Sequence, residues 1–311
     1  MTKICLTIAG LDPSGGAGII ADIKTFEAFG CFATAAISSI TFQNTTGVFG
    51  AAHQTAESIR GQVEPILQDY NIAAIKTGML PTREVIREVA ELIRKNNLKN
   101  IVVDPVVRST SGFDLIDNDA LQCLIENLFP LADLITPNIP EVERIYGVAI
   151  ESERDIADAA EIMHSQGARN VLIKGGHLSN ADSALQKPAR EQGRYAHLRT
   201  KRAGPERECN MQKPARSKGE TTGTQASLPA HHTATDYLFL SGDLHKIDGP
   251  FYETTATHGT GCVLSAAIAA NLALGKSLLE AVRIAKAFVN QAIRTAPMIG
   301  HGHSPINVKP I

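Results

Sequence analysis

The strongest constraint on the fold is the alternation of short aliphatic runs with amphipathic helical patterns along the chain. Residues 4–9, 73–77 and 170–174 are almost continuously apolar, without the alternation expected of a strand that faces water on one side. Strands of this kind lie in parallel sheets covered on both faces. The sequence therefore predicts a three-layer α/β/α sandwich with a mostly parallel central sheet.

The same patterns locate the remaining elements. We expect further strands at residues 33–40 and 100–104 and one that ends at residues 134–136, and helices after residue 18 and at residues 83–95, 155–166 and 278–296. A long apolar helix is expected directly after residue 262. These elements belong to one domain that spans residues 1–311.

Composition excludes several classes of partner. The chain has 311 residues, a net charge of -2 and a pI near 6.6, which argues against nucleic-acid or membrane-surface binding. No stretch approaches the roughly 18 apolar residues of a membrane span. The five cysteines are odd in number and form no C-x-x-C pair, so we expect neither a disulfide framework nor a zinc site, and a reducing cytoplasm fits better.

One basic segment interrupts the pattern at about residues 180–235. It holds ten Lys/Arg and five Asp/Glu, a local charge of +5, and its few large apolar residues follow no period. Such a stretch buries too little surface to offset its ordering entropy, so the sequence predicts a flexible insertion in the domain. A tolerated insertion and a basic tether for an acidic partner are the two interpretations. The duplicated QKPAR at residues 186–190 and 212–216 favours the first.

Loops rich in Gly and polar residues follow five of the predicted strands. Because the carboxyl ends of parallel strands meet at one edge of a sheet, these loops are expected to line a shared ligand crevice. They comprise residues 10–18, 78–81, 104–112, 136–141 and 174–177.

Residues 258–262 (HGTGC) provide the strongest chemical signal. A Gly-rich turn that feeds a helix presents several N–H groups and the positive end of the helix dipole to an anion, and phosphate is the natural ligand. Cys262 stands at the helix start, where a lowered pKa would make its thiolate a base for an attacking hydroxyl. An inert buried cysteine is the alternative.

Four polar residues follow other predicted strands. Asp104, Asn138 and Glu141 offer oxygen ligands for Mg²⁺, bound through water as a nucleotide kinase requires. Their structural alternatives are a strand end before proline for Asp104 and an N-cap of a helix at Pro140 for Asn138. Asp22 follows the first Gly-rich turn, and its structural alternative is a solvated helix face.

Six ordered motifs resemble those of bacterial hydroxymethylpyrimidine/phosphomethylpyrimidine kinases, across residues 3–179 and 236–307. They are AGLDPSGGAGIIADIKTFEAFG, IKTGML, VVDPVVRSTSG, ITPNIPEVE, VLIKGGH and HGTGCVLSAAIAANLALG. The resemblance implies a ribokinase-like fold and a thiamine-biosynthesis enzyme. Such an enzyme uses MgATP to phosphorylate 4-amino-5-hydroxymethyl-2-methylpyrimidine and then its monophosphate. It also implies a cytoplasmic homodimer.

The resemblance also implies a role for each site residue. The pyrimidine would lie near Gly10, Asp22, Gln43, Met79 and Val106, and Gln43 would hydrogen-bond the edge of its ring. MgATP would be held by Asp104, Asn138, Glu141 and Lys174, with Mg²⁺ nearest Asp104 and Glu141. The anion hole would be formed by Gly259, Thr260 and Gly261, and Cys262 would be the base.

Two other functions remain open at this point. A pyridoxal/pyridoxine kinase of the same branch acts on a similar flat heteroaromatic alcohol, and a non-catalytic pyrimidine-binding protein would retain the same pocket. Gly300, His301, Gly302 and His303 suggest a metal site, but we interpret them as the end of a loop.

Overall fold

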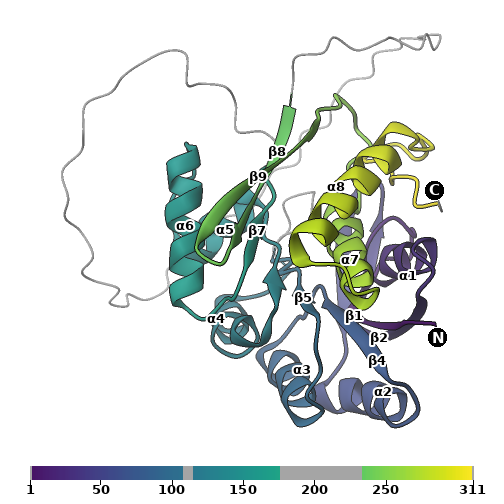
Figure 1. Cartoon of the computed structure of the whole chain (residues 1–311). Coiled ribbons are helices and arrows are strands. Elements are labelled where there is room, and N and C mark those ends of the chain that lie inside the picture. Colours follow the sequence, from purple (N-terminus) through teal and green to yellow (C-terminus); the bar gives the residue numbers. More distant parts are fainter. Residues whose placement is uncertain (1, 108–114, 176–232, 310–311) are drawn as a thin grey trace, which may run out of the picture. The chain divides into compact units, whose positions relative to one another are not determined.

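The computed structural model describes residues 2–107, 115–175 and 233–309 (Figure 1). Chain contacts group Met1–Leu178 with His232–Ile311 as one body. The predicted insertion at residues 180–235 lies outside the described residues, except for residues 233–235, which open a strand. The last part of two predicted loops, residues 108–112 and 176–177, also lies outside them.

Within the described ranges, nine strands form one sheet in the order β3-β2-β1-β4-β5-β6-β7-β8-β9. They are β1 (Ile4–Leu11), β2 (Phe32–Asn44), β3 (Gly47–His53), β4 (Ile72–Thr77), β5 (Ile101–Val103), β6 (Leu134–Ile135), β7 (Val171–Ile173), β8 (Thr233–Leu240) and β9 (Asp243–Pro250). The six central strands of this order, β2-β1-β4-β5-β6-β7, are parallel. At the two edges of the sheet, β3 pairs antiparallel with β2, β8 with β7, and β9 with β8. The mostly parallel sheet confirms the sequence prediction, but β3, β8 and β9 were missed.

Three helices cover one face of the sheet: α1 (Gly18–Ala28), α7 (Thr260–Ala273) and α8 (Leu278–Arg294). Helix α7 is apolar on all sides because it is enclosed by α1, α8 and the central strands β1, β4 and β5. Its many alanines allow this close approach, and most of its residues are buried. The predicted long apolar helix is therefore confirmed as the central helix of this face.

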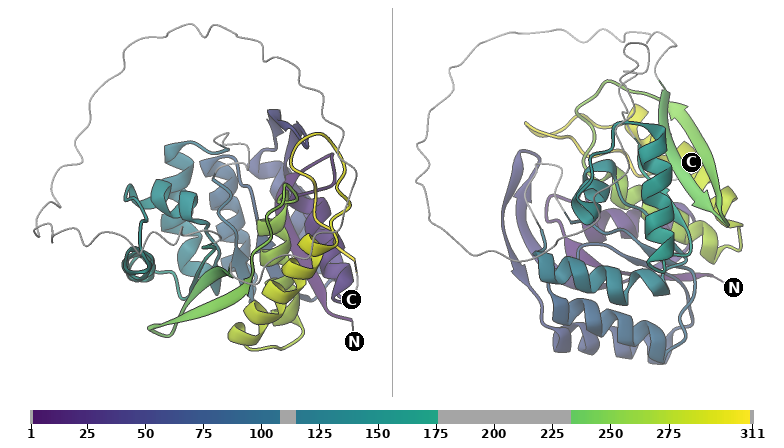
Figure 2. Two further views of the ribbon diagram at one scale, coloured as in Figure 1. Left: turned by 90° about the horizontal axis from the view of Figure 1, so that it is seen from above. Right: turned by 90° about the vertical axis from the view of Figure 1, so that its left-hand side faces the viewer.

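The other face carries α2 (Ala56–Asp69), α3 (Arg83–Lys95), α4 (Asn118–Asn127), α5 (Ile139–Tyr146) and α6 (Glu153–Ser165) (Figure 2). Helix α3 has the predicted bounds because Thr82 caps its first turn and its apolar residues recur on one face. Helices on both faces complete the predicted three-layer α/β/α sandwich. No helix in the described ranges is long and apolar enough to span a membrane.

The strand register brings the polar loops together. Val103 pairs with Ile135, and Ile135 with Val171, so the residues that follow β5, β6 and β7 emerge side by side. A further bridge joins Asn138 to Lys174 beyond the strand ends. The predicted shared edge of the sheet therefore exists in the fold.

Candidate active site

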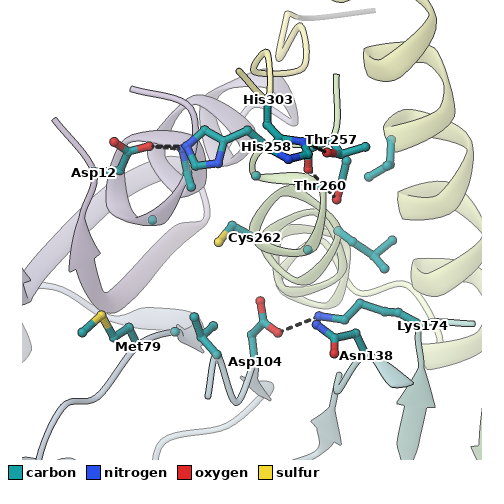
Figure 3. A pocket seen from close by; sticks show the side chains of 18 of the residues that line it. Asp12, Met79, Asp104, Asn138, Lys174, Thr257, His258, Thr260, Cys262 and His303 are labelled. Carbon is teal, nitrogen blue, oxygen red and sulfur yellow. Dashed lines mark hydrogen bonds and ion pairs between the residues drawn. The ribbon is translucent and has the colours of Figure 1, made fainter. Parts of the chain in front are cut away.

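A cavity of about 450 Å³ lies at this edge, between the strand ends and the first turn of α7 (Figure 3). This volume is within the usual range for small-molecule sites. Of the thirteen predicted site residues, all but Asp22 line it: Gly10, Gln43, Met79, Asp104, Val106, Asn138, Glu141, Lys174, Gly259, Thr260, Gly261 and Cys262. The fold thus gathers residues that are as far apart in the sequence as Gly10 and Cys262.

The Gly-rich turn before α7 has the geometry of an anion-binding loop. Gly259 is the N-cap of α7 with a φ of 82°, a left-handed conformation that favours glycine. A Cβ at this position would also clash with the carbonyl oxygen of Gly16. Because the first-turn N–H groups of a helix have no intrahelical partner, Gly261 and Cys262 offer donors and the dipole's positive end to the cavity. The N–H of Thr260 donates to the Thr257 carbonyl at 3.4 Å.

Asp104, Glu141 and Lys174 form a second feature, called the open cluster below. Lys174 Nζ lies 2.9 Å from Asp104 Oδ1 and 3.8 Å from Glu141 Oε2. Burial raises the pKa of Glu141 to about 7. Burial disfavours the charged form of Lys174, yet the two carboxyl groups raise the pKa of its ammonium above the ordinary value. The cluster has two carboxyl groups and one cation, which suits the binding of a further cation or a charged ligand.

Asn138 and Glu141 also shape the local backbone. The Asn138 side chain accepts the N–H of Glu141 at 2.9 Å, and the Glu141 carboxylate accepts the N–H of Asn138 at 2.8 Å. This capping box begins α5 at Ile139, so the structural alternative for Asn138 is confirmed. Capping and cavity lining are compatible, because both side chains still reach the cavity.

The thiol of Cys262 does not have the predicted low pKa. Burial raises its pKa to about 11, against the lowering effect of Lys76. The helix N-terminus is the reason for which a lowered pKa was predicted, but desolvation of the thiolate outweighs it here. Cys262 is therefore a thiol at neutral pH in the unliganded protein.

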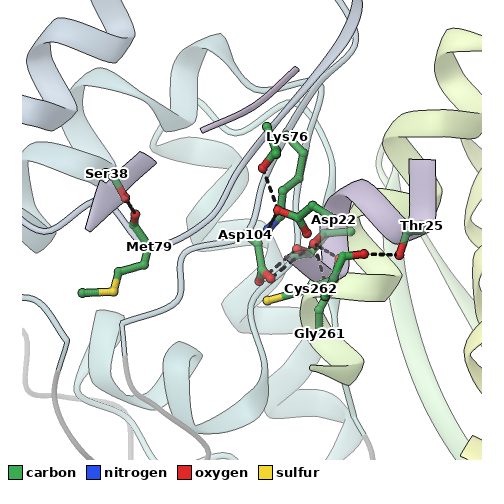
Figure 4. A network of polar contacts seen from close by, with 12 residues as sticks. Asp22, Thr25, Ser38, Lys76, Met79, Asp104, Gly261 and Cys262 are labelled. Atoms are coloured by element: carbon green, nitrogen blue, oxygen red, sulfur yellow. Dashed lines mark hydrogen bonds and ion pairs between the residues drawn. The ribbon is translucent and has the colours of Figure 1, made fainter. Parts of the chain in front are cut away.

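Asp22 lies behind the cavity lining instead of within it. Its side chain is fully buried, accepts a hydrogen bond from Thr7 at 2.6 Å and pairs with Lys76 Nζ at 2.8 Å (Figure 4). The solvated helix face that was its structural alternative is therefore wrong, because α1 turns this position toward the sheet. Direct contact with a ligand in the cavity is equally unavailable, since Lys76 stands between them in the lining.

Val106, Met79, Gly10 and Gln43 line the end of the cavity that lies next to β1, β2 and β4. A Cβ at Gly10 would lie 3.3 Å from Met79 Sδ, so the main chain and the thioether are in close contact there. These residues offer apolar surface together with one amide side chain. Such a lining suits a flat ring with a polar edge.

Residues 12–208 and 218–307 match the sequence family described as phosphomethylpyrimidine kinase. The chain belongs to this family. Its members are kinases, and the chain is accordingly a phosphotransferase with the ribokinase-like form of the α/β/α sandwich.

Individual relatives agree with this assignment. The hydroxymethylpyrimidine/phosphomethylpyrimidine kinase of Haemophilus influenzae is 38% identical over 306 residues, 98% of this chain and 96% of the relative. The crystal structure of phosphomethylpyrimidine kinase from Clostridium difficile is 34% identical with a TM-score of 0.68, and covers 94% of this chain and 100% of its own. Pyridoxal kinase from Staphylococcus aureus, in complex with AMP-PCP and pyridoxal, is 27% identical with a TM-score of 0.75 and covers 99% of this chain and 94% of its own.

Lys76 and the contact of His258 with Asp12 were missed by sequence reasoning. Lys76 lines the cavity from the end of β4, and its signal was a lysine within an otherwise apolar strand. His258 Nε2 lies 2.7 Å from Asp12 Oδ2, which joins the turn before α7 to the loop after β1. Burial would raise the pKa of Asp12, but hydrogen bonds from His258 and Ser14 hold it at about 2.

A further part of the cavity was also missed. It is lined by the end of β9 and by α8, with Pro250, Phe251, Val289, Asn290 and Ile293. Sequence patterns identified α8 as a helix but not which of its residues face a ligand. The packing of α8 beside β9 shows that the cavity extends past the Gly-rich turn along this largely apolar surface.

Proposed function

We propose that the protein transfers the γ-phosphoryl group of ATP to 4-amino-5-hydroxymethyl-2-methylpyrimidine and then to its monophosphate, in thiamine biosynthesis. One observation carries this proposal. An anion-binding helix start, a lysine and a cysteine share a single cavity with the slot formed by Gln43, Met79 and Val106. A phosphoryl donor and a flat acceptor therefore fit side by side.

The triphosphate is assigned to the turn before α7 and to Lys174. Phosphate oxygens accept hydrogen bonds from the N–H groups of Gly261 and Cys262, and Lys174 neutralises part of their charge. The nucleoside extends along the largely apolar surface of β9 and α8. The complex of the Staphylococcus aureus pyridoxal kinase with AMP-PCP supports nucleotide binding in this fold.

Mg²⁺ is assigned to Asp104 and Glu141. Both are buried carboxyl groups at the cavity wall, and oxygen donors of this type suit a hard cation that keeps several waters. When bound, the ion would neutralise phosphate charge. Asp104 is in turn oriented by Thr136 and Ser265, whose hydroxyl groups lie 3.3 Å from its carboxylate.

The pyrimidine is assigned to the slot next to β1 and β2. Gln43 hydrogen-bonds the amino and ring-nitrogen edge, and Met79 and Val106 contact the ring. Asp22 takes no direct part in this binding, because it lies behind Lys76. Its role is to hold Lys76.

The transfer follows from these positions. The Cys262 thiol first loses its proton to solvent. The hydroxymethyl oxygen then attacks the γ-phosphorus, the bond to the ADP oxygen breaks, and the hydroxyl proton passes to the Cys262 thiolate. The N–H groups of the α7 turn and Lys174 stabilise the negative charge of the transition state. In the second reaction the attacking phosphate oxygen is already ionised, so no base is required there.

The test is mass analysis of the products formed from hydroxymethylpyrimidine, ATP and Mg²⁺. We expect the monophosphate first and the diphosphate later. Pyridoxal in a parallel reaction measures the second candidate, which the likeness to pyridoxal kinase structures favours. A kcat/KM that is higher with pyridoxal would overturn the proposal, and tight pyrimidine binding without any product would favour the non-catalytic alternative.

Three broader features are part of the same proposal. The chain acts as a single kinase domain with an insertion at about residues 180–235, it is cytoplasmic, and it forms a homodimer. The balanced charge and the scattered cysteines support the location, and the family resemblance supports the dimer.

A further inference from the structure

A buried ion pair beside the cavity has no part in the reaction described so far. Lys76 and Asp22 are both 0% exposed, and their charged atoms lie 2.8 Å apart. Removing two charges from water is expensive, and an apolar pair of similar size would stabilise the core equally well or better. A pair of this kind at the wall of an active site therefore indicates a functional reason for the charges.

The geometry directs the lysine, rather than the aspartate, toward the cavity. Lys76 belongs to the lining and Asp22 does not. Gly78 makes room for the lysine, since a Cβ there would lie only 2.9 Å from Nζ. On the far side, Asp22 Oδ2 accepts both Lys76 and Thr7, whereas Asp22 Oδ1 is buried without a hydrogen-bond partner.

Lys76 and Cys262 both line the cavity, and Figure 4 shows them in the same polar network. Charged groups approach the thiol from four elements: Lys76 on β4, Asp22 on α1, Asp104 after β5 and Lys174 after β7. Lys174 faces two carboxyl groups, those of Asp104 and Glu141, whereas Lys76 forms an ion pair with one, that of Asp22. Burial is the main cause that raises the pKa of the thiol to about 11, and Lys76 is the main cause that opposes it.

We propose that Lys76, held in place by Asp22, is a positioning residue that supplies the stabilising positive charge for the thiolate of Cys262. The inference rests on the proposed role of Cys262 as the base of the first phosphorylation. Burial by itself lowers the pKa of the Lys76 ammonium, but the Asp22 carboxylate raises that pKa above its ordinary value. Lys76 therefore remains protonated while the thiol gains and loses its proton.

The test measures the thiol directly, without any turnover. The folded full-length protein reacts with iodoacetamide over a range of pH, and mass spectrometry follows the peptide that contains Cys262. The alkylation rate follows the thiolate fraction. We expect Lys76→Met to slow alkylation of Cys262 about tenfold at pH 8, the factor that corresponds to one pKa unit, and to move the pH profile upward.

Two further variants keep the test decisive. Asp22→Asn combined with Lys76→Met removes both charges and avoids an unpaired buried carboxylate. It is expected to move the profile in the same direction by a smaller amount, because Asp22 itself raises the thiol's pKa. Lys286→Met is the matched control, since Lys286 also lines the cavity and forms an ion pair with Asp236 at 2.8 Å. It should leave the Cys262 profile unchanged.

An unchanged or downward-shifted Cys262 profile in both Lys76 variants would overturn the inference. A shift of the same size in Lys286→Met would also overturn it, because the effect would then be a general consequence of breaking a buried pair.

The pH dependence of kcat separates this inference from the function on which it rests. If Cys262 is the base, Lys76→Met moves the profile of the first phosphorylation upward together with the alkylation profile. If only the alkylation profile moves, the charge partnership stands and the role of Cys262 as the base is wrong.

Discussion

Two groups of Lys and acidic side chains at the cavity differ in burial and in charge balance. One is the sealed pair of Lys76 with Asp22, and the other is the open cluster of Lys174, Asp104 and Glu141. The side chains of the pair are 0% exposed and matched one to one, whereas Lys174 is 15% exposed and faces two carboxyl groups. Burial and charge balance distinguish the two. The sealed pair can change the pKa values of neighbouring groups, whereas the open cluster can also bind a charged ligand.

The largest expected effect comes from breaking the sealed pair. Lys76→Met leaves a buried carboxylate without its cation, which should lower the free energy of unfolding by about 3–5 kcal/mol. The double substitution Asp22→Asn and Lys76→Met should recover most of this loss. Urea denaturation measures both. Lys246→Met is the control, because its pair with Glu153 is half exposed and should cost less than about 0.5 kcal/mol.

In the open cluster, substitution should affect catalysis more than stability. Lys174→Met removes a cation from the phosphoryl site, and we expect kcat to fall about 100-fold to 1000-fold. The loss should be equal with hydroxymethylpyrimidine and with its monophosphate, because both reactions transfer the same group. Steady-state kinetics with the two acceptors test this, and a loss confined to one acceptor contradicts the assignment.

Cys262 lines the same cavity as Lys76 and Lys174, and its proposed role differs between the two reactions. Cys262→Ala should slow the first phosphorylation about 100-fold, the usual contribution of a general base, and the second less than about threefold. The same kinetics with each acceptor measure the difference. Cys123→Ala, a buried cysteine on α4, should leave the ratio of the two rates unchanged. Equal losses in Cys262→Ala would exclude the base.

The contact of Asp12 with His258 is expected to give the smallest effect. The pKa of Asp12 is about 2 in the folded protein, below its ordinary value, so its stabilisation is present above about pH 4 and is lost as the pH falls through 2. Asp12→Asn should cost about 2 kcal/mol near pH 7, and the deficit should disappear on acidification.

Thermal unfolding of wild type and variant between pH 2 and pH 7 measures this prediction. Asp243→Asn, an exposed carboxylate at the start of β9, is the control and should show no such window. A deficit that stays constant down to pH 2 would show that the Asp12 charge contributes nothing.

Site residues were predictable where a motif stands directly after a strand. Asp104, Asn138, Glu141 and Lys174 were expected at one edge because parallel strands end there, and the register brings them together in the cavity lining. Asp22 was expected near the ligand but lies buried outside the lining, because its sequence position does not reveal which way α1 faces. Lys76 was missed because a lysine in a strand has no meaning until its partner is known.

By itself, the sequence determined the layered fold, most elements and the anion-binding turn, because these depend on short-range patterns of apolar residues and glycines. Only the tertiary structure decided the partner of Asp22, the raised pKa of Cys262 and the surface that β9 and α8 add to the cavity. These properties depend on desolvation and on contacts between distant segments. The residues next to a side chain in the sequence do not determine its desolvation or its contacts with distant segments.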